Sequence, residues 1–123
     1  MITSMYKKYE HTIVITNRTL VQGDFFEQMQ KVILLHPHAV ILREKDLPDD
    51  AYEVVAEKVL DMCREEDVNC LLHSRITIAK SLGCGRIHLS IPVIEEMKEE
   101  EQRNLRKDFQ EISVSCHSME DMK

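Results

Sequence analysis

The sequence lacks the features that mark membrane proteins and multidomain proteins. None of the apolar stretches among its 123 residues is long enough to cross a bilayer, so no membrane partner is expected. The first apolar run is too short for a signal peptide. The chain has no Gly/Ser-rich linker, and its length suits one folding unit. We therefore predict a single domain over residues 1–123.

The chain also lacks a basic excess and any paired-cysteine motif. Its formal net charge is −6, whereas nucleic-acid-binding domains are usually basic, so no nucleic-acid partner is expected. The four cysteines show neither a CxxC spacing nor a metal-finger pattern, and reduced thiols of this kind are typical of a cytoplasmic protein. The acids gather in 46–67 and 95–108, which we interpret as solvated helix faces.

What the sequence does contain is a series of five short apolar runs, each followed by a cluster of polar residues. The runs lie at 12–15, 39–42, 70–72, 87–89 and 112–115. Nearly continuous apolar runs are typical of strands buried on both faces, and parallel strands need long, usually helical connections. The sequence therefore predicts parallel βα repeats. Folds of this class build their sites at the carboxyl ends of the strands.

The connections between these runs carry helix signals. Asp24 and Glu27 have the spacing of a capping box, and Gly83 suits the end of a helix over 77–82. A further helix is expected to begin at Asp49 or Asp50. Its expected buried stripe consists of Val54, Val55, Val59, Leu60 and Met62.

Two architectures accommodate five such repeats. A second capping-box spacing, from Ser118 to Asp121, predicts the start of a helix close to the last residue. This favours the N-terminal part of a TIM (β/α)8-like barrel, truncated after the fifth strand. The alternative is a flavodoxin-like open parallel sheet.

Four motifs that follow or include the strands carry a resemblance to a known family. They are Leu-Arg-Glu-Lys at 42–45, Leu-His-Ser-Arg at 72–75, Gly-Arg-Ile-His-Leu-Ser at 85–90 and Ser-Val-Ser-Cys-His-Ser at 113–118. In this order and spacing they resemble the thiamine phosphate synthase family, which includes the TenI-type thiazole tautomerases. The resemblance implies a (β/α)8 barrel, of which this sequence covers the first five strands.

Departures from the family pattern bear on the activity that the resemblance implies. The synthases join a pyrimidine pyrophosphate to a thiazole phosphate with Mg²⁺, and their motif has Asn-Asp where this chain has His73 and Ser74. A second family aspartate is replaced within Ile91-Pro92-Val93. Mg²⁺ prefers oxygen ligands, chiefly carboxylates. The resemblance therefore favours a metal-independent thiazole tautomerase without a cofactor, and Mg²⁺ is expected only if the chain is synthase-like.

Proton transfer without a metal needs an acid/base group that titrates near neutrality, and histidine is the usual choice. On the resemblance, His117 is the candidate proton shuttle. Arg43 and Lys45, two residues apart on an expected extended segment, would bind a phosphate or carboxylate. The alternative is that these cations pair with neighbouring acids such as Glu44. Further candidate contacts to substrate or phosphate are His73, Ser74, Ser90 and Ser115.

The expected partners follow from the resemblance and from the open barrel. The substrate of the tautomerase branch is a small phosphorylated thiazole. A partial barrel leaves unpaired strand edges, which template association, so we expect a homo-oligomer through the open edge. The alternatives are a pyrophosphate-releasing thiamine-phosphate synthase and a non-catalytic half-barrel that serves as a binding or association module.

Overall fold

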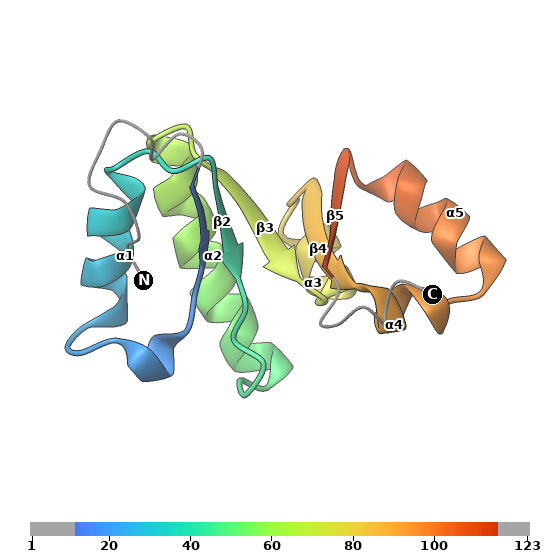
Figure 1. The fold of residues 1–123 in the computed structure, drawn as a ribbon, viewed down its shortest axis with the longest axis horizontal. Coiled ribbons are helices and arrows are strands. Elements are labelled where there is room, and N and C mark those ends of the chain that lie inside the picture. The colour runs from blue at the N-terminus through green and yellow to red at the C-terminus, as the bar shows by residue number, and fades with distance from the viewer. Residues whose placement is uncertain (1–11, 116–123) are drawn as a thin grey trace. The chain divides into compact units, whose positions relative to one another are not determined.

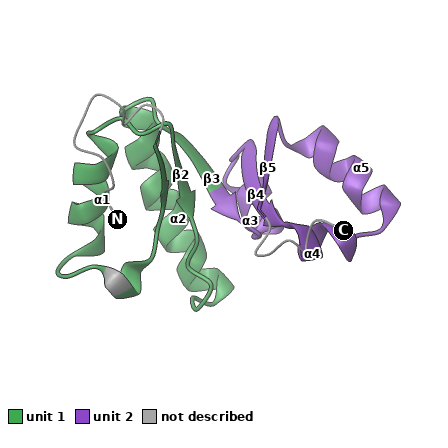
Figure 2. Cartoon of the chain, viewed as in Figure 1, with its two compact units in different colours: residues 1–71 green, residues 72–123 purple. Residues whose placement is uncertain are grey.

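The computed structural model describes residues 12–115 of the chain. The chain divides into two compact units, residues 1–71 and 72–123, and each is described by itself (Figure 2). Unit 1 contains β1 (Ile13–Ile15), a short 3-10 helix η2 (Arg18–Leu20), α1 (Phe25–Ile33), β2 (Ala39–Leu42) and α2 (Asp49–Glu65) (Figure 1). Unit 2 contains α3 (Ile76–Ser81), β4 (Arg86–Ser90), α4 (Ile91–Glu95), α5 (Glu99–Asp108) and β5 (Glu111–Ser115). The strand β3 (Asn69–His73) crosses the boundary.

Unit 1 is a βαβα unit whose helices pack on each other. The ammonium group of Lys58 on α2 lies 4.1 Å from the ring centroid of Phe26 on α1. The cap of α1 is the predicted one, because the carboxylate of Asp24 accepts hydrogen bonds from two backbone N–H groups of the first turn. All four residues of β2 are buried. The other core residues of α1 and β1 are Val14, Met29, Val32 and Ile33.

Unit 2 has a sheet with one apolar and one polar face. Along β4, Ile87 and Leu89 have no exposed surface, whereas His88 and Ser90 alternate with them on the opposite face. On β5 the residues in register with His88 and Ser90 are Ser113 and Ser115. The polar face of this sheet therefore carries His88, Ser90, Ser113 and Ser115.

Strand pairing is parallel throughout. In unit 1 the strands follow the order β1-β2-β3, and in unit 2 they follow β3-β4-β5. A flavodoxin-like sheet has the order 2-1-3-4-5, which would place β1 between β2 and β3. That alternative is wrong, and the consecutive order is the one that the barrel prediction requires.

The predicted start of α2 is confirmed, and its predicted buried stripe needs correction. α2 begins at Asp49 as expected, but Pro48 occupies its cap position and no side chain caps it. The predicted buried stripe of α2 is right for Val59 and Leu60 but wrong for Val54, which is 69% exposed. The residues that face the core are Tyr52, Ala56, Val59, Leu60 and Cys63. These positions share one helical face at spacings of three and four residues.

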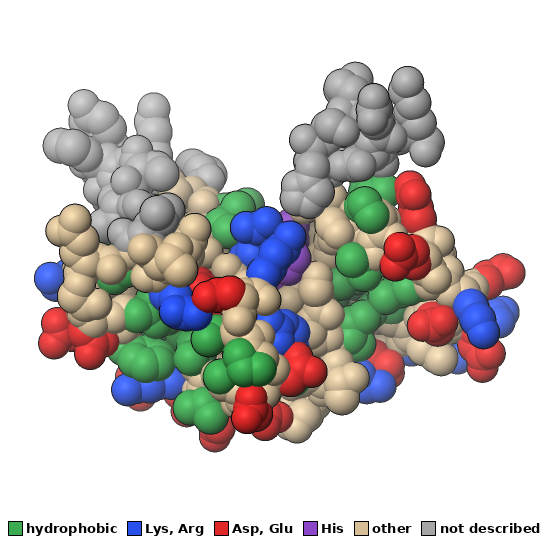
Figure 3. All heavy atoms as spheres, turned by 90° about the horizontal axis from the view of Figure 1, so that it is seen from below, with side chains coloured by type: hydrophobic (Ala, Val, Ile, Leu, Met, Phe, Trp, Pro, Cys, Tyr) green, Lys and Arg blue, Asp and Glu red, His purple; other side chains and the backbone are tan. Residues whose placement is uncertain are grey.

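Other sequence expectations are met. Gly83 has a φ of +71°, the left-handed conformation expected of a residue that ends a helix. α5 has charged side chains on its outer side, so this acidic stretch is a solvated helix face (Figure 3). Cys63, Cys70 and Cys84 are buried and are not joined in disulfide bonds. Within residues 12–115, none of the helices combines the length and apolar character needed to span a bilayer.

Candidate functional site

In unit 1, the ends of β1 and β2 are tied together by a buried carboxylate. Glu44, two residues beyond β2, is only 3% exposed. Its Oε1 and Oε2 atoms accept hydrogen bonds from the backbone N–H of Arg18, at 3.0 and 3.2 Å. This N–H opens η2, the short helix that follows β1. The carboxylate thus satisfies a helix-terminal donor that has no partner within the helix.

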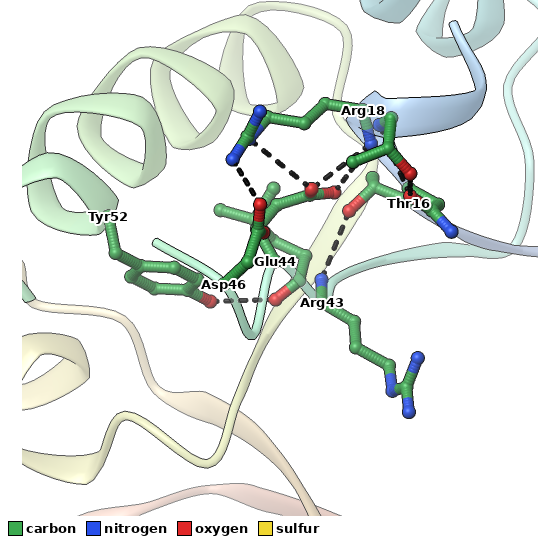
Figure 4. Close-up of polar contacts among 9 residues, drawn as sticks. Thr16, Arg18, Arg43, Glu44, Asp46 and Tyr52 are labelled. Atoms are coloured by element: carbon green, nitrogen blue, oxygen red, sulfur yellow. Dashed lines mark hydrogen bonds and ion pairs between the residues drawn. The ribbon is translucent and has the colours of Figure 1, made fainter. Parts of the chain in front are cut away.

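The side chain of Arg18 adds two ionic contacts to this connection. Its Nε atom lies 3.7 Å from Oε1 of Glu44, and its terminal nitrogen forms an ion pair with Asp46 (Figure 4). One arginine from the end of β1 therefore contacts both acids of the segment that follows β2.

The backbone of Arg43 is hydrogen-bonded to Thr16, and its guanidinium group points away from Glu44 and Asp46 (Figure 4). Its N–H donates to Oγ1 of Thr16 at 3.0 Å, and Thr16 itself is 1% exposed. In Figure 4 the guanidinium group of Arg43 extends away from Glu44 and Asp46. The strand end is anchored once more by Tyr52, whose hydroxyl donates to the carbonyl oxygen of Leu42 at 2.7 Å. The backbone around Arg43 is thus fixed from β1 and from α2.

The predicted extended segment from Arg43 to Lys45 is wrong. β2 ends at Leu42, and Lys45 is an exposed residue in a turn that the hydrogen bond from Leu47 N to Glu44 O closes at 3.2 Å. Strand alternation therefore does not set the direction of Lys45. The alternative prediction pairs Arg43 and Lys45 with Glu44, Asp46 or a neighbouring helix acid. Among residues 12–115 no such ion pair is found, and both Glu44 and Asp46 contact Arg18.

In unit 2, two histidines lie side by side, His73 as the last residue of β3 and His88 in the middle of β4. His73 and His88 are in register, and their ring centroids are 5.6 Å apart with the planes tilted by 32°. Both are buried, with 7% and 8% of their surface exposed. Nδ1 of His88 shares a hydrogen bond of 2.9 Å with Oγ of Ser113 on β5. Because one ring nitrogen is engaged by a hydroxyl, the partner fixes the orientation of the ring.

The predicted serines lie at the same strand ends. Ser74 follows β3 directly and has a φ of +65°, a left-handed conformation that is uncommon for serine. Its N–H donates to the carbonyl oxygen of His88 at 2.9 Å. Ser90 and Ser115 are in register at the ends of β4 and β5. His73, Ser74, Ser90 and Ser115 therefore belong to one edge of the unit 2 sheet.

The remaining predicted site residues fall elsewhere. Arg43 and Lys45 belong to unit 1, and their convergence with the unit 2 residues stays a prediction. His117, the predicted proton shuttle, lies outside the described residues. Arg18 and Thr16 had no predicted role, although both belong to the polar cluster after the first apolar run. Their position at the end of the strand next to β2 is the signal that could have identified them.

The side chains at the end of β3 do not fit a magnesium ion. This strand ends in the imidazole of His73 and the hydroxyl of Ser74, and Pro92 and Val93 follow β4. Mg²⁺ prefers carboxylate and other oxygen ligands in octahedral geometry. Within residues 12–115, no three or more His, Cys, Asp or Glu side chains gather as metal ligands could. The absence of a cofactor stays a prediction.

Comparison with known proteins places these strand ends in a fold and a family. The chain is similar to a solved structure, the thiamine phosphate pyrophosphorylase from Pyrococcus furiosus, with a TM-score of 0.72 and 20% sequence identity. The similarity covers 94% of this chain and 54% of that protein, so the chain spans about half of its length. The prediction of the N-terminal part of a TIM-like barrel is confirmed.

The family follows from the sequence itself. A family model described as thiamine monophosphate synthase matches residues 12–123. The chain therefore belongs to the thiamine monophosphate synthase family, as the four motifs predicted. A search of the curated proteins found no match.

Proposed function

We propose that the chain is a thiazole tautomerase-like member of its family, which moves a proton within a thiazole carboxylate phosphate without a metal ion. The observation that carries this proposal is the pair of buried imidazoles, His73 and His88, on the neighbouring strands β3 and β4. Imidazole is suited to proton transfer near neutral pH, whereas the pyrophosphate-releasing reaction of the synthase branch depends on oxygen ligands for Mg²⁺.

Each predicted residue has a role in this proposal. Arg43 and Lys45 bind the phosphate or carboxylate of the substrate. His73, Ser74, Ser90 and Ser115 contact the substrate from the edge of the unit 2 sheet. His117 carries the proton, and this assignment comes from the sequence resemblance. The enzyme is proposed to act in the cytoplasm on a small phosphorylated thiazole.

Turnover of the purified 123-residue chain tests the reaction. The chain is incubated with the non-aromatic tautomer of the thiazole carboxylate phosphate, and formation of the aromatic ring is followed by absorbance. We expect conversion above the buffer rate, and we expect His117→Ala to lower the rate by about 10²–10⁴-fold, the usual contribution of an acid/base group. The matched control is His36→Ala, an exposed histidine that precedes β2, which should leave the rate unchanged.

The same preparation separates the alternatives. Mg²⁺-dependent release of pyrophosphate from the pyrimidine substrate would replace the tautomerase with a synthase. Binding of the phosphorylated thiazole without either reaction would leave a non-catalytic binding module. An unchanged rate in His117→Ala would remove His117 from the mechanism.

A role in association is favoured by a separate observation. β1 carries Ile13 and Ile15, which are 52% and 53% exposed, and among the described strands it pairs only with β2. We propose that copies of the chain associate through this edge. Light scattering should show an oligomer that Ile15→Asp converts to smaller species. A wild-type monomer over the same concentrations would contradict the proposal.

A further inference from the structure

The segment that follows β2 alternates in charge, with Arg43, Glu44, Lys45 and Asp46 in succession. Such a segment could neutralise itself, because each cation has an acid beside it. An anionic substrate would then have to displace these acids before it could bind. Which partner each acid takes therefore decides whether the cations are available.

Both acids of the segment contact Arg18, which follows β1. We propose that Arg18 is a positioning residue for an anion-binding subsite: it engages both acids of the segment and leaves Arg43 and Lys45 for a phosphate group. The inference rests on the proposed function, in which these two cations bind the phosphate of the substrate.

The contacts of Glu44 carry the first half of the argument. Its carboxylate accepts the backbone N–H of Arg18 on both oxygens, at 3.0 and 3.2 Å, and faces the Arg18 Nε at 3.7 Å. A carboxylate that is 97% buried needs such charged and hydrogen-bonded partners. Asp46, which is exposed, is drawn to the terminal nitrogen of the same guanidinium group (Figure 4).

The second half of the argument concerns the cations Arg43 and Lys45. Within the described part of the chain, neither Arg43 nor Lys45 forms an ion pair. The backbone of Arg43 is anchored by Thr16, while its guanidinium group points away from the acids (Figure 4). A fixed backbone with an unpaired guanidinium group is a preorganised partner for the paired oxygens of a phosphate.

Removal of the Arg18 charge should therefore weaken anion binding by Arg43 and Lys45, although Arg18 itself does not contact the anion. In Arg18→Met the backbone N–H still donates to Glu44, so the connection between the strand ends is retained. Asp46 loses its cation and becomes available to Lys45 and Arg43. One uncompensated charge a few ångströms from a surface site weakens binding by roughly three- to tenfold.

The test is calorimetric titration of the 123-residue chain with inorganic phosphate at low ionic strength. Arg18→Met should raise the Kd by roughly three- to tenfold, whereas Arg18→Lys, which keeps the charge, should stay within about twofold. The matched control is Arg64→Met, which removes a surface cation of unit 1 that is paired with Asp61 at 3.6 Å near the end of α2. It should leave the Kd within about twofold, because a rise of about 1.5 Å per residue places Arg64 roughly 20 Å along α2 from the start of that helix, which follows the segment.

A second substitution, Asp46→Asn, distinguishes the effect of the Arg18 charge from a structural role of the Arg18 side chain. Asp46→Asn should restore binding in the Arg18→Met background, and alone it should not weaken binding. If Arg18→Met weakens binding and Asp46→Asn does not restore it, the arginine supports the fold only, and the inference is overturned. If Arg18→Met does not fold, the single variant Asp46→Asn tests the inference instead. Weaker phosphate binding by Asp46→Asn than by the wild type would overturn the inference.

Arg43→Ala distinguishes the two levels of the proposal. If Arg43→Ala leaves the Kd unchanged, or if the wild type does not bind inorganic phosphate, the phosphate site itself is wrong and the inference fails with it. If Arg43→Ala weakens binding and Arg18→Met does not, the phosphate site stands and only the role of Arg18 is overturned.

Discussion

Glu44→Gln is the substitution that most directly tests the connection between the ends of β1 and β2. It keeps the size of the side chain but removes its charge and turns one acceptor oxygen into a donor. Both oxygens of Glu44 now accept the N–H of Arg18, and a hydrogen bond to a charged group contributes about 1.5–3 kcal/mol. We expect Glu44→Gln to lower the free energy of unfolding by about 2–3 kcal/mol.

The matched control uses the other acid of the same arginine. Asp46 is 55% exposed and forms its ion pair at the surface, where solvent screening leaves such pairs near zero to about 1 kcal/mol. Asp46→Asn should therefore cost less than about 0.5 kcal/mol. Both variants remove a carboxylate charge that faces Arg18, and they differ in burial and in the backbone hydrogen bonds that only Glu44 accepts.

Urea denaturation followed by far-ultraviolet circular dichroism measures both. With a slope of about 1–3 kcal/mol per molar urea, Glu44→Gln should lower the unfolding midpoint by about 0.7–3 M, and Asp46→Asn should lower it by no more than about 0.5 M. Equal midpoints for Glu44→Gln and the wild type would refute the argument, because the buried carboxylate would then contribute nothing. A loss in Asp46→Asn as large as in Glu44→Gln would refute the distinction by burial.

Three further substitutions test other parts of the structure. Tyr52→Phe leaves the carbonyl oxygen of Leu42 without its hydroxyl partner in a buried position, so it should lower the free energy of unfolding by about 1–2 kcal/mol; an unchanged urea midpoint would contradict the assigned hydrogen bond. Ser113→Ala removes the hydroxyl from Nδ1 of His88, so the imidazole ¹⁵N shifts should report a changed tautomer population, and identical shifts would show that the serine does not hold the ring. Gly83→Ala meets no atom within 4 Å but places a side chain at a φ of +71°; thermal unfolding should show a loss of about 1 kcal/mol, and a gain in stability would be inconsistent with the left-handed turn.

The strands could be read from the sequence because their apolar runs are short and uninterrupted. The run at 39–42 is β2 itself, and the other four observed strands differ from the predicted runs by one or two residues. The consecutive strand order could not be derived from these runs alone, since both a barrel and a flavodoxin-like sheet use the same alternation of elements. The family motifs favoured the barrel, and strand pairing decided it.

The buried face of α2 shows where hydropathy alone fails. Val54 is apolar and exposed, whereas Tyr52 is partly polar and has no exposed surface. The difference arises because the hydroxyl of Tyr52 finds an acceptor at the end of β2, which allows the whole ring to be buried. A tertiary hydrogen bond of this kind leaves no periodic signal in the sequence.

The candidate site was predicted in part. The sequence located its residues at strand ends, and His73, Ser74, Ser90 and Ser115 are found there in unit 2. The contacts of Arg18 with Glu44 and Asp46 could not be predicted, because they join segments 26 and 28 residues apart. The neighbouring cations, Arg43 and Lys45, attracted attention through the family motif, while the arginine that engages the acids lies in another loop.

The most direct test of the central claim is the rate at which the 123-residue chain aromatises the thiazole carboxylate phosphate tautomer in the presence of excess EDTA. The account predicts a rate well above that in buffer and unchanged when Mg²⁺ replaces EDTA. A rate equal to that in buffer, or one that appears only with Mg²⁺, would contradict metal-independent proton transfer as the function of this chain.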